Sequence, residues 1–395
     1  MIEIAQIADA LFSTTMTSPL QMGALSGDTL GRGIDAMIAK DYATAAREFR
    51  RTISLSPFSD NSLKATEYLA NAYSAQGKTG EAIKALRQGI KIFPTADNLN
   101  ISLGNMLFSE GRYEEAAVEY TEAVKKNPTN SENYYSLGQA YLSLKQYGSA
   151  ETNFKKTIQL SPRDSAGYYA LGQTYRMTGR YSEAEQQLNK ALSIKRDFPY
   201  VHYELGALYA EQKQMDKASE ELTIVEEKAP EFLLDLQNKI YENSDPRFIA
   251  AYSTDINLSQ PPGTLLSEID SSLSTPNAQK SFTVNFVFDK NMDAAVVQNI
   301  ANWEISRSTN YTTGGAYNWG MALPSSEISV SSLPTSVYFD SENNTAQLTF
   351  TLTQNAAGDG TIDLSHLVFK FKGTDMHGNS MDPLADQYNS ISLIG

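Results

Sequence analysis

Two stretches of the sequence, YYSLGQAYLSLKQYGSAETNFKKTIQLSP at residues 134–162 and YYALGQTYRMTGRYSEAEQQLNKALSIKR at residues 168–196, repeat one pattern 34 residues apart. In each stretch, apolar residues recur at helical spacing on both sides of a short polar turn. Small residues lie where two helices must approach closely, and a proline ends the first stretch because proline cannot continue a helical hydrogen-bond ladder. The pattern therefore predicts a helical hairpin in each unit.

The step of 34 residues extends through the first half of the chain, where Pro94, Pro128, Pro162 and Pro230 lie at multiples of it. Other positions keep the same step over five units. They are Leu69, Leu103, Leu137, Leu171 and Leu205, each followed by Ala70, Gly104, Gly138, Gly172 and Gly206, with Ala82, Ala116, Ala150, Ala184 and Ala218 further on. A first unit near 26–59 is degenerate in its first helix, and the step of 37 from Pro57 to Pro94 indicates about three inserted residues.

This pattern resembles the tetratricopeptide repeat family, in LGQAY at 137–141 and LGQTY at 171–175 with an alanine, an aromatic residue and a proline downstream. The resemblance covers residues 26–232 in six units. It implies an α-solenoid that binds ligands on a concave face. With a capping helix at 231–242, we predict a solenoid domain over 26–244. The apolar N-terminal segment 1–25 either caps this solenoid or docks on another chain.

In this family, set positions of the first helix of each repeat line the concave groove. Carried onto this sequence, they give the candidate peptide-binding residues Asn98, Ile101, Asn105, Phe108, Tyr135, Gln139, Tyr169, Gln173, Arg176 and Tyr203. Asn105, Gln139 and Gln173 form a row of amides that both donate and accept hydrogen bonds, and the three tyrosines form a row that adds contact area with a polar tip. Such rows suit a peptide or protein segment. The alternative is that the tyrosines pack within the solenoid.

The composition changes after residue 245. Residues 245–280 are rich in Ser, Pro and Asn and are predicted to be a linker. From 281 onward apolar residues alternate, as in Phe282, Val284, Phe286 and Phe288, which predicts half-buried strands of an all-β sandwich over 281–395.

Three runs of this region, FVFDKNMD (286–293), NWEIS (302–306) and GTDMHGNSMDP (373–383), resemble the bacterial immunoglobulin-like domains of cell-surface and S-layer proteins. An unrelated sandwich is the alternative. The acidic cluster of Asp375, Asp382 and Asp386 lacks the regularly spaced ligands of a calcium loop. We therefore interpret it as solvated turn residues, and a calcium site is the alternative.

The 395 residues carry 32 Lys and Arg against 46 Asp and Glu, a net charge of -14, and no cysteine. This balance argues against a nucleic-acid partner and against docking on an anionic membrane. The absence of cysteine excludes disulfides, thiolate metal sites and cysteine nucleophiles. The sequence also lacks a phosphate-binding loop, a G-x-S-x-G elbow and an H-E-x-x-H pair. We predict a protein that is not an enzyme and needs no metal or cofactor.

The leading hypothesis is a protein–protein interaction scaffold whose solenoid groove binds a peptide or protein segment, with the β-sandwich as a second contact surface. The alternative is a structural subunit of a self-assembling extracellular or cell-surface filament, sheath or layer, joined as a homopolymer through the N-terminal segment. A weaker third hypothesis is an enzyme carried by the β region. We expect an extracellular or surface location, reached through a processed or uncleaved N-terminus. A cytoplasmic location is the alternative.

Overall fold

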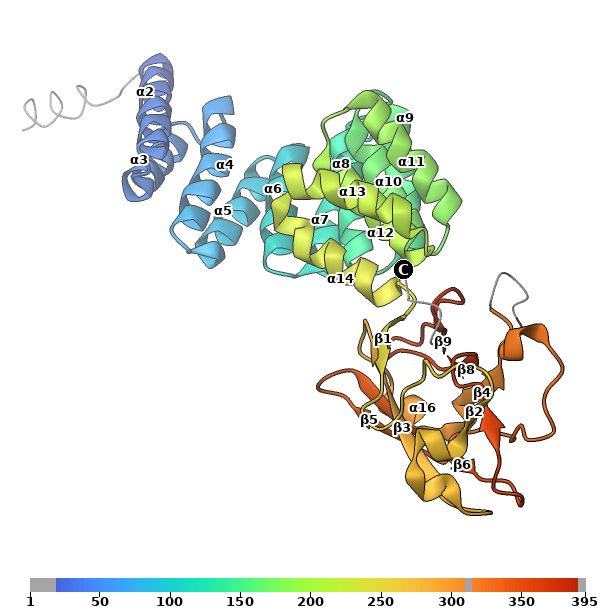
Figure 1. Ribbon diagram of the computed structural model, residues 1–395. Helices are drawn as coiled ribbons and strands as arrows, with labels where there is room; N and C mark the ends of the chain where they lie inside the picture. Colours follow the sequence, from blue (N-terminus) through green and yellow to red (C-terminus); the bar gives the residue numbers. More distant parts are fainter. Residues whose placement is uncertain (1–18, 310–314, 390–395) are drawn as a thin grey trace, which may run out of the picture. The chain divides into compact units, whose positions relative to one another are not determined.

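The computed structural model describes residues 19–309 and 315–389, and the chain divides into two compact units (Figure 1). The first unit contains residues 1–208 and 220–232, and the second contains residues 209–219 and 233–395. Most of the segment 1–25, predicted as a cap or a docking element, lies outside the described residues. No helix in the described ranges is both long enough and apolar enough to cross a bilayer.

Helices that pair into consecutive hairpins build the N-terminal part of the chain. In chain order they are α2 (Pro19–Ile38), α3 (Tyr42–Leu55), α4 (Asp60–Ala75), α5 (Thr79–Ile92), α6 (Asp97–Ser109), α7 (Tyr113–Lys126), α8 (Ser131–Ser143), α9 (Tyr147–Leu160), α10 (Ser165–Met177), α11 (Tyr181–Ile194), α12 (Pro199–Glu211) and α13 (Met215–Lys228). These twelve helices correspond to the six predicted repeats. The short helix η1 (Pro230–Phe232) and helix α14 (Leu233–Asn243) follow them.

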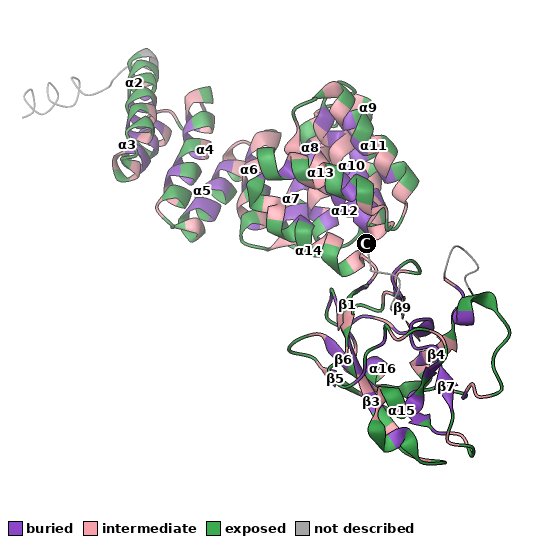
Figure 2. Ribbon diagram, viewed as in Figure 1, coloured by how far each residue is buried: buried purple, intermediate pink, exposed green. Residues whose placement is uncertain are grey.

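A close contact between a glycine of the first helix and a large side chain of the second holds several of the hairpins together, while Ala70 takes the place of the glycine in the hairpin of α4 and α5. A Cβ atom added to Gly104 would lie 2.4 Å from the ring of Tyr120, and one added to Gly138 would lie 2.5 Å from the ring of Phe154. The two residues of each pair are 16 positions apart. Because the glycine has no side chain, the ring of the second helix packs directly on the backbone of the first. Figure 2 shows buried residues along these helices.

The first hairpin differs from the prediction in two respects. Its first helix begins at Pro19 rather than near residue 26, and it is not degenerate at the contact point. A Cβ atom on Gly33 would lie 2.4 Å from the ring of Phe49, again 16 residues further on. The sequence pattern concealed this glycine because the charged Arg32 precedes it, where the later units have a buried leucine.

The second unit contains three antiparallel sheets, one of them with the strand order β1-β3-β6-β5, one with β4-β8-β9 and one with β2-β7. The strands are β1 (Phe248–Tyr252), β2 (Thr264–Leu265), β3 (Gln279–Phe288), β4 (Trp303–Arg307), β5 (Ser336–Asp340), β6 (Thr345–Thr353), β7 (Thr361–Ile362), β8 (Leu367–Phe371) and β9 (Gln387–Asn389). Short helices lie between them: α15 (Leu266–Ile269), η2 (Ser271–Ser274), α16 (Ala294–Gln298), η3 (Ile300–Asn302) and η4 (Tyr317–Gly320).

Aromatic side chains from the two larger sheets meet in one core. Phe286 of β3 lies 5.3 Å from Trp303 of β4 and 5.6 Å from Phe369 of β8, measured between ring centroids. Phe350 of β6 also lies 5.6 Å from Phe369. The alternation along β3 places its phenylalanines on this buried side, as the period of two predicts. The β region is therefore a folded unit with its own core.

The prediction of a linker over 245–280 is wrong for most of that stretch. Strand β1 pairs with β3 along the larger sheet, and the loop after it places Ile256 and Leu258 in the same aromatic core. Leu266 and Leu273 are fully buried there as well. The polar composition of the segment concealed these four apolar residues, which are spaced too irregularly to produce a strand or helix period.

A buried lysine joins α14 to the β strands within the second unit. The Lys290 Nζ atom donates to the Ser244 carbonyl at 2.6 Å and lies 2.7 Å from Asp375 Oδ2 and 4.9 Å from the centre of the Tyr241 ring. These three partners match the three N–H bonds of an ammonium group. Ser244 follows the last residue of α14, so the positive charge also lies at the negative end of that helix.

The acidic cluster predicted as turn residues is held by separate cations. Asp375 pairs with Lys290, Asp382 with Arg247 and Asp386 with Lys370. Among the described residues, no group of three or more carboxylates and histidines is arranged to hold a metal ion. The three carboxylates therefore do not converge on one point.

We predict that Gly33→Ala destabilises the solenoid by about 1–3 kcal/mol, because the new methyl group overlaps the Phe49 ring. Gly31→Ala in the same helix is the matched control, since no atom lies within 4 Å of a Cβ there. Because alanine loses less backbone entropy than glycine on folding into a helix, Gly31→Ala should raise the free energy of unfolding by as much as about 1 kcal/mol. Thermal unfolding followed by circular dichroism, with hydrogen exchange of α2 and α3, measures both. Equal stability of the two variants would contradict the contact.

A second prediction concerns the pH dependence of the second unit. Burial alone would raise the pKa of Asp375, but hydrogen bonds from Asn379 and Lys290 outweigh it and hold this pKa below the ordinary 3.8. The carboxylate therefore stabilises the fold above pH 3.8, and this contribution is lost as the pH falls through the lower folded-state pKa.

Lys290→Met should cost about 3–5 kcal/mol near neutral pH, because it leaves the Asp375 charge buried and unpaired. The stability difference from the wild type should narrow as the pH falls, because buried Asp375 takes up its proton at a higher pH without Lys290 than with it. It should be smallest below the lowered folded-state pKa of wild-type Asp375. Lys372→Met, which breaks the exposed pair with Glu304, is the control and should cost less than about 1 kcal/mol. Urea unfolding between pH 2 and 7 gives these values. A difference that stays constant with pH would contradict the role of the pair.

Candidate functional site

The predicted groove residues lie on the first helices of consecutive hairpins, α6, α8, α10 and α12. Three of them, Asn98, Ile101 and Asn105, line a hollow of about 400 Å³ that spans α4, α6 and α8. The other lining residues are mostly acids and amides, namely Glu67, Asp97, Ser102, Asn127, Asn130, Glu132 and Asn133. The family's groove positions predicted part of this hollow, including Glu132 at the first of these positions in its repeat, whereas the acids Glu67 and Asp97 were found only from the structure.

The polar side chains of the hollow hold one another in place. Asn133 is fully buried and donates to Asp97 Oδ2 at 3.0 Å, and Ser102 donates to Glu67 Oε1 at 3.3 Å. Burial raises the pKa of Glu67, although hydrogen bonds from Asn98 and Ser102 oppose this shift. Glu132 is exposed in the first turn of α8. Carboxylates and amides thus face the hollow with fixed geometry.

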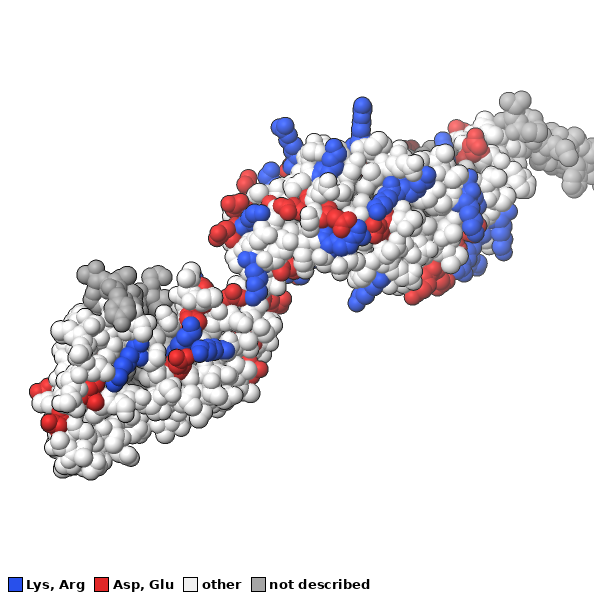
Figure 3. Space-filling view, turned by 90° about the vertical axis from the view of Figure 1, so that its right-hand side faces the viewer, with Lys and Arg blue, Asp and Glu red and all other residues white. Residues whose placement is uncertain are grey.

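No lysine or arginine is among the residues that line the hollow. Over the visible face of the helical repeats, by contrast, acidic and basic side chains are interspersed (Figure 3). Lys126 lies outside the lining, where it donates to Asn100 Oδ1 and interacts electrostatically with Asp97. The lining itself carries three carboxylates and no cation, and a concave surface strengthens the negative potential that they create. The hollow is therefore suited to a positively charged group.

The tyrosine row lies on α8, α10 and α12, and each of its rings packs against another aromatic ring. Tyr135 lies 5.9 Å from Phe154, Tyr169 lies 5.2 Å from Phe198, and Tyr203 lies 5.1 Å from Phe232. All three tyrosines are half-buried. Each of the three tyrosines therefore packs against a ring within the solenoid, as the alternative interpretation proposed, while part of its side chain stays accessible.

Burial also perturbs the hydroxyl groups of this row. It is the largest cause of the raised pKa of Tyr135 and of Tyr169. The negative charge of Glu204 raises the pKa of Tyr169 further. These hydroxyls therefore stay protonated at any physiological pH and act as neutral hydrogen-bonding groups.

Two of the predicted groove residues, Gln173 and Arg176, are bound to a buried carboxylate. Gln173 Nε2 and Arg176 Nε each lie 2.6 Å from a carboxylate oxygen of Glu204, which is 1% exposed. Because Glu204 is buried, its charge needs these donors, and they are not available to a ligand in this arrangement. Gln173 and Arg176 therefore stabilise the contact between α10 and α12.

Sequence reasoning missed Glu204. The signal was present, because the positions one and two steps of 34 earlier are Ala170 and Ser136, so that an acid replaces a small residue. An acidic residue at a helix–helix contact requires a cation or donors nearby, and Arg176, directly after LGQTY, stands where the neighbouring repeats have Leu142 and Ala210. An acid at position 204 and a cation at position 176, both unusual at their repeat positions, together indicate that these two residues pair.

Three further predicted residues, Asn105, Gln139 and Phe108, contact side chains of their own hairpins. Asn105 is exposed and accepts a 2.7 Å hydrogen bond from the Tyr120 hydroxyl, and Gln139 hydrogen-bonds to Tyr135. Phe108 packs edge-on against Tyr113, with the ring centroids 5.0 Å apart, and contacts the hydrophobic core of its hairpin. Phe108 therefore belongs to the core more than to the groove surface.

Comparison with known proteins agrees with the geometry of the hairpins. Sequence models of the tetratricopeptide repeat match residues 104–145 and 172–213 in one form, 153–186 in a second, and 69–95 and 131–164 in a third. The chain therefore contains tetratricopeptide repeats, as the period of 34 residues predicts. No curated protein matches the chain as a whole in sequence.

Several solved structures are similar to part of the chain. A tetratricopeptide repeat protein from Parabacteroides merdae is 19% identical, with 55% of this chain and 86% of that chain covered and a TM-score of 0.49. PilF of Pseudomonas aeruginosa is 17% identical, with coverages of 55% and 99% and a TM-score of 0.47. YrrB, described as a repeat protein with an unusual peptide-binding site, is 21% identical, with coverages of 49% and 99% and a TM-score of 0.40.

Proposed function

We propose that the solenoid is a non-enzymatic scaffold that binds an extended peptide or protein segment carrying a basic side chain. The observation that carries this proposal is the hollow over α4, α6 and α8, where Glu67, Asp97 and Glu132 are accompanied by amides and by no cation. Tetratricopeptide solenoids present such concave surfaces for binding.

The chemistry of the lining favours a peptide over other ligands. Asn98 and Asn105 carry amides, which can pair with the N–H and C=O groups of an extended backbone. The carboxylates would accept from a lysine or arginine side chain placed in the hollow, and charge-assisted hydrogen bonds are the stronger ones. Further along, the accessible parts of Tyr135 and Tyr169 add contact area that costs little side-chain entropy.

A peptide array tests this proposal. We expect the full chain to retain peptides enriched in lysine and arginine, and to release them as salt is raised, since screening weakens attraction between exposed charges. Glu132→Lys should weaken retention roughly tenfold, because it places a cation at the rim of the hollow. Fluorescence anisotropy with the best retained peptide measures the change.

Glu114→Lys is the matched control, because Glu114 is an exposed acid in the first turn of α7, as Glu132 is in α8, but does not line the hollow. It should leave the affinity unchanged while producing the same change in net charge. Retention of acidic peptides, or equal weakening by both variants, would show that the hollow is not the binding site.

We also propose that the second unit is of the bacterial immunoglobulin-like type, acts at the cell surface and supplies a second contact surface. Its support is the pair of antiparallel sheets around one aromatic core. The edge strand β1 adds to this, since its Ile249 is 58% exposed. Unprotected edge strands with apolar side chains are places where another chain can add.

Self-assembly into a filament or layer is the second candidate function, and the same exposed edge strand favours it. Sedimentation of the full chain and of a chain lacking residues 1–18 separates the possibilities. The truncation leaves α2 complete, since that helix begins at Pro19. Assembly through the N-terminal segment predicts large species for the full chain alone. Monomers in both preparations would contradict it.

A further inference from the structure

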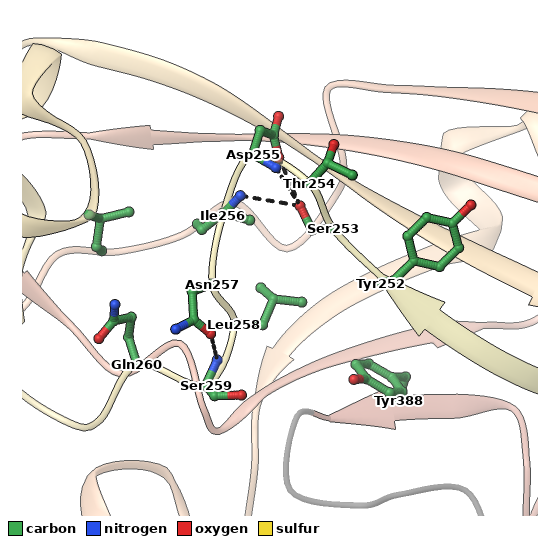
Figure 4. Close-up of a pocket in the computed structure, with 11 residues that line it drawn as sticks. Tyr252, Ser253, Thr254, Asp255, Ile256, Asn257, Leu258, Ser259, Gln260 and Tyr388 are labelled. Atoms are coloured by element: carbon green, nitrogen blue, oxygen red, sulfur yellow. Dashed lines mark hydrogen bonds between the residues drawn. The ribbon is translucent and has the colours of Figure 1, made fainter.

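The second unit contains a pocket that the proposed peptide groove does not involve. It has a volume of about 610 Å³, within the range of about 300–1,000 Å³ that is usual for small-ligand sites. The loop from Ser253 to Gln260, directly after β1, forms one continuous wall, and Tyr252, Ile269 and Tyr388 complete the lining. Figure 4 shows Tyr252 and Tyr388 at one end of the pocket and the side-chain amides of Asn257 and Gln260 toward the other.

The wall of this pocket is fixed in shape before any ligand arrives. Ile256 and Leu258 point into the aromatic core, whereas the residues between and beside them stay exposed. The Asp255 carboxylate accepts from the Thr283 backbone N–H at 3.1 Å, and Asn257 Oδ1 accepts from the Ser259 N–H at 3.0 Å. A preformed site saves the entropy that ordering a loop on binding would cost.

Several polar groups of the lining have no hydrogen-bond partner in the part of the chain that the structure describes. They are the hydroxyls of Tyr252, Thr254, Ser259 and Tyr388, the amide of Gln260 and the Nδ2 group of Asn257. All of them are neutral, and each can offer a donor, an acceptor or both. The one acid of the lining, Asp255, is already bound to the backbone of β3.

The lining excludes several classes of ligand. It contains no lysine, arginine or histidine, so it offers no counter-charge to a phosphate, sulfate or carboxylate group. An apolar ligand would leave the neutral hydroxyls and amides buried without partners, which costs free energy for each group. A neutral molecule rich in hydroxyl groups needs no counter-charge from the lining, and its hydroxyls can hydrogen-bond to the neutral hydroxyls and amides of the pocket.

We propose that this pocket binds a neutral carbohydrate. The C–H face of a sugar ring is apolar and packs on an aromatic ring, which Tyr252, 51% exposed, and Tyr388 supply at one end of the pocket. The ring hydroxyls both donate and accept, and they match the side chains of Asn257, Ser259 and Gln260. The combination gives the unit a glycan-binding activity that is independent of the peptide groove.

A peptide fits the same surface less well. An added strand needs a row of free backbone groups to pair with. In this loop, however, the N–H groups of Ile256, Ser259 and Gln260 are used within the loop, by Ser253 Oγ, Asn257 Oδ1 and the Asn257 carbonyl. What the wall offers is side-chain hydroxyls and amides, which do not repeat at strand spacing.

An array of neutral, sialylated and sulfated oligosaccharides, incubated with the full chain, tests the proposal. We expect retention of neutral oligosaccharides built from glucose, mannose, galactose or N-acetylglucosamine. Calorimetry with the best retained one should show the affinity falling roughly tenfold or more in Tyr252→Ala, because the stacking surface is lost. Gln260→Ala should weaken binding as well, through the loss of two hydrogen-bonding atoms.

Tyr338→Ala is the matched control, since Tyr338 is an equally exposed tyrosine on the edge strand β5 outside the pocket. It should bind the oligosaccharide as the wild type does, and thermal unfolding confirms that each variant folds. The proposal is overturned if no neutral oligosaccharide is retained, if only sulfated ones are, or if Tyr252→Ala and Tyr338→Ala bind equally. Retention of peptides through Tyr252 would assign the pocket to a peptide and also overturn it.

Discussion

The contact between a glycine and a large side chain 16 residues later is the constraint on which the solenoid depends. It occurs at Gly33 with Phe49, Gly104 with Tyr120, Gly138 with Phe154 and Gly172 with Leu188. Because the hairpins stack as similar units and most of them share this contact, a given position of the first helix recurs in the next hairpin after one repeat. The amide and tyrosine rows, and the hollow between α4, α6 and α8, follow from this recurrence.

The second unit depends on a different balance, between an aromatic core and a few buried charges. Phenylalanines from both larger sheets meet Trp303, and the loop after β1 adds Ile256 and Leu258 to the same core. That anchoring turns the polar residues of the loop outward, where they line the pocket beside Tyr252. Lys290 and Asp375 are compensated because each finds enough partners to replace water. Core packing therefore positions polar groups that the pattern of the strands does not specify.

Much of the fold was predictable, and the errors have identifiable causes. Periods of 34 and of two residues indicated the hairpins and the strands correctly, since both reflect which side of an element is buried. The linker prediction failed because Ser, Pro and Asn outnumber the five buried apolar residues that anchor 245–280, namely Phe248, Ile256, Leu258, Leu266 and Leu273. In the site, Asn98, Ile101 and Asn105 do line a hollow, whereas Gln173 and Arg176 are bound to Glu204. A repeat position specifies the face of a helix but not the partner that a neighbouring repeat supplies.

The sequence by itself determined the repeat architecture, the separate β region and the candidate rows of groove residues. These depend on the spacing of residue types along the chain, and spacing is a local property. Only the tertiary structure decided which side chains remain available to a ligand. It brought Glu67 and Glu132 to one hollow, bound Arg176 to a buried carboxylate, and gathered Tyr252, Gln260 and Tyr388 around one pocket. Burial and hydrogen-bond pairing arise between residues far apart in the chain, so no sequence period records them.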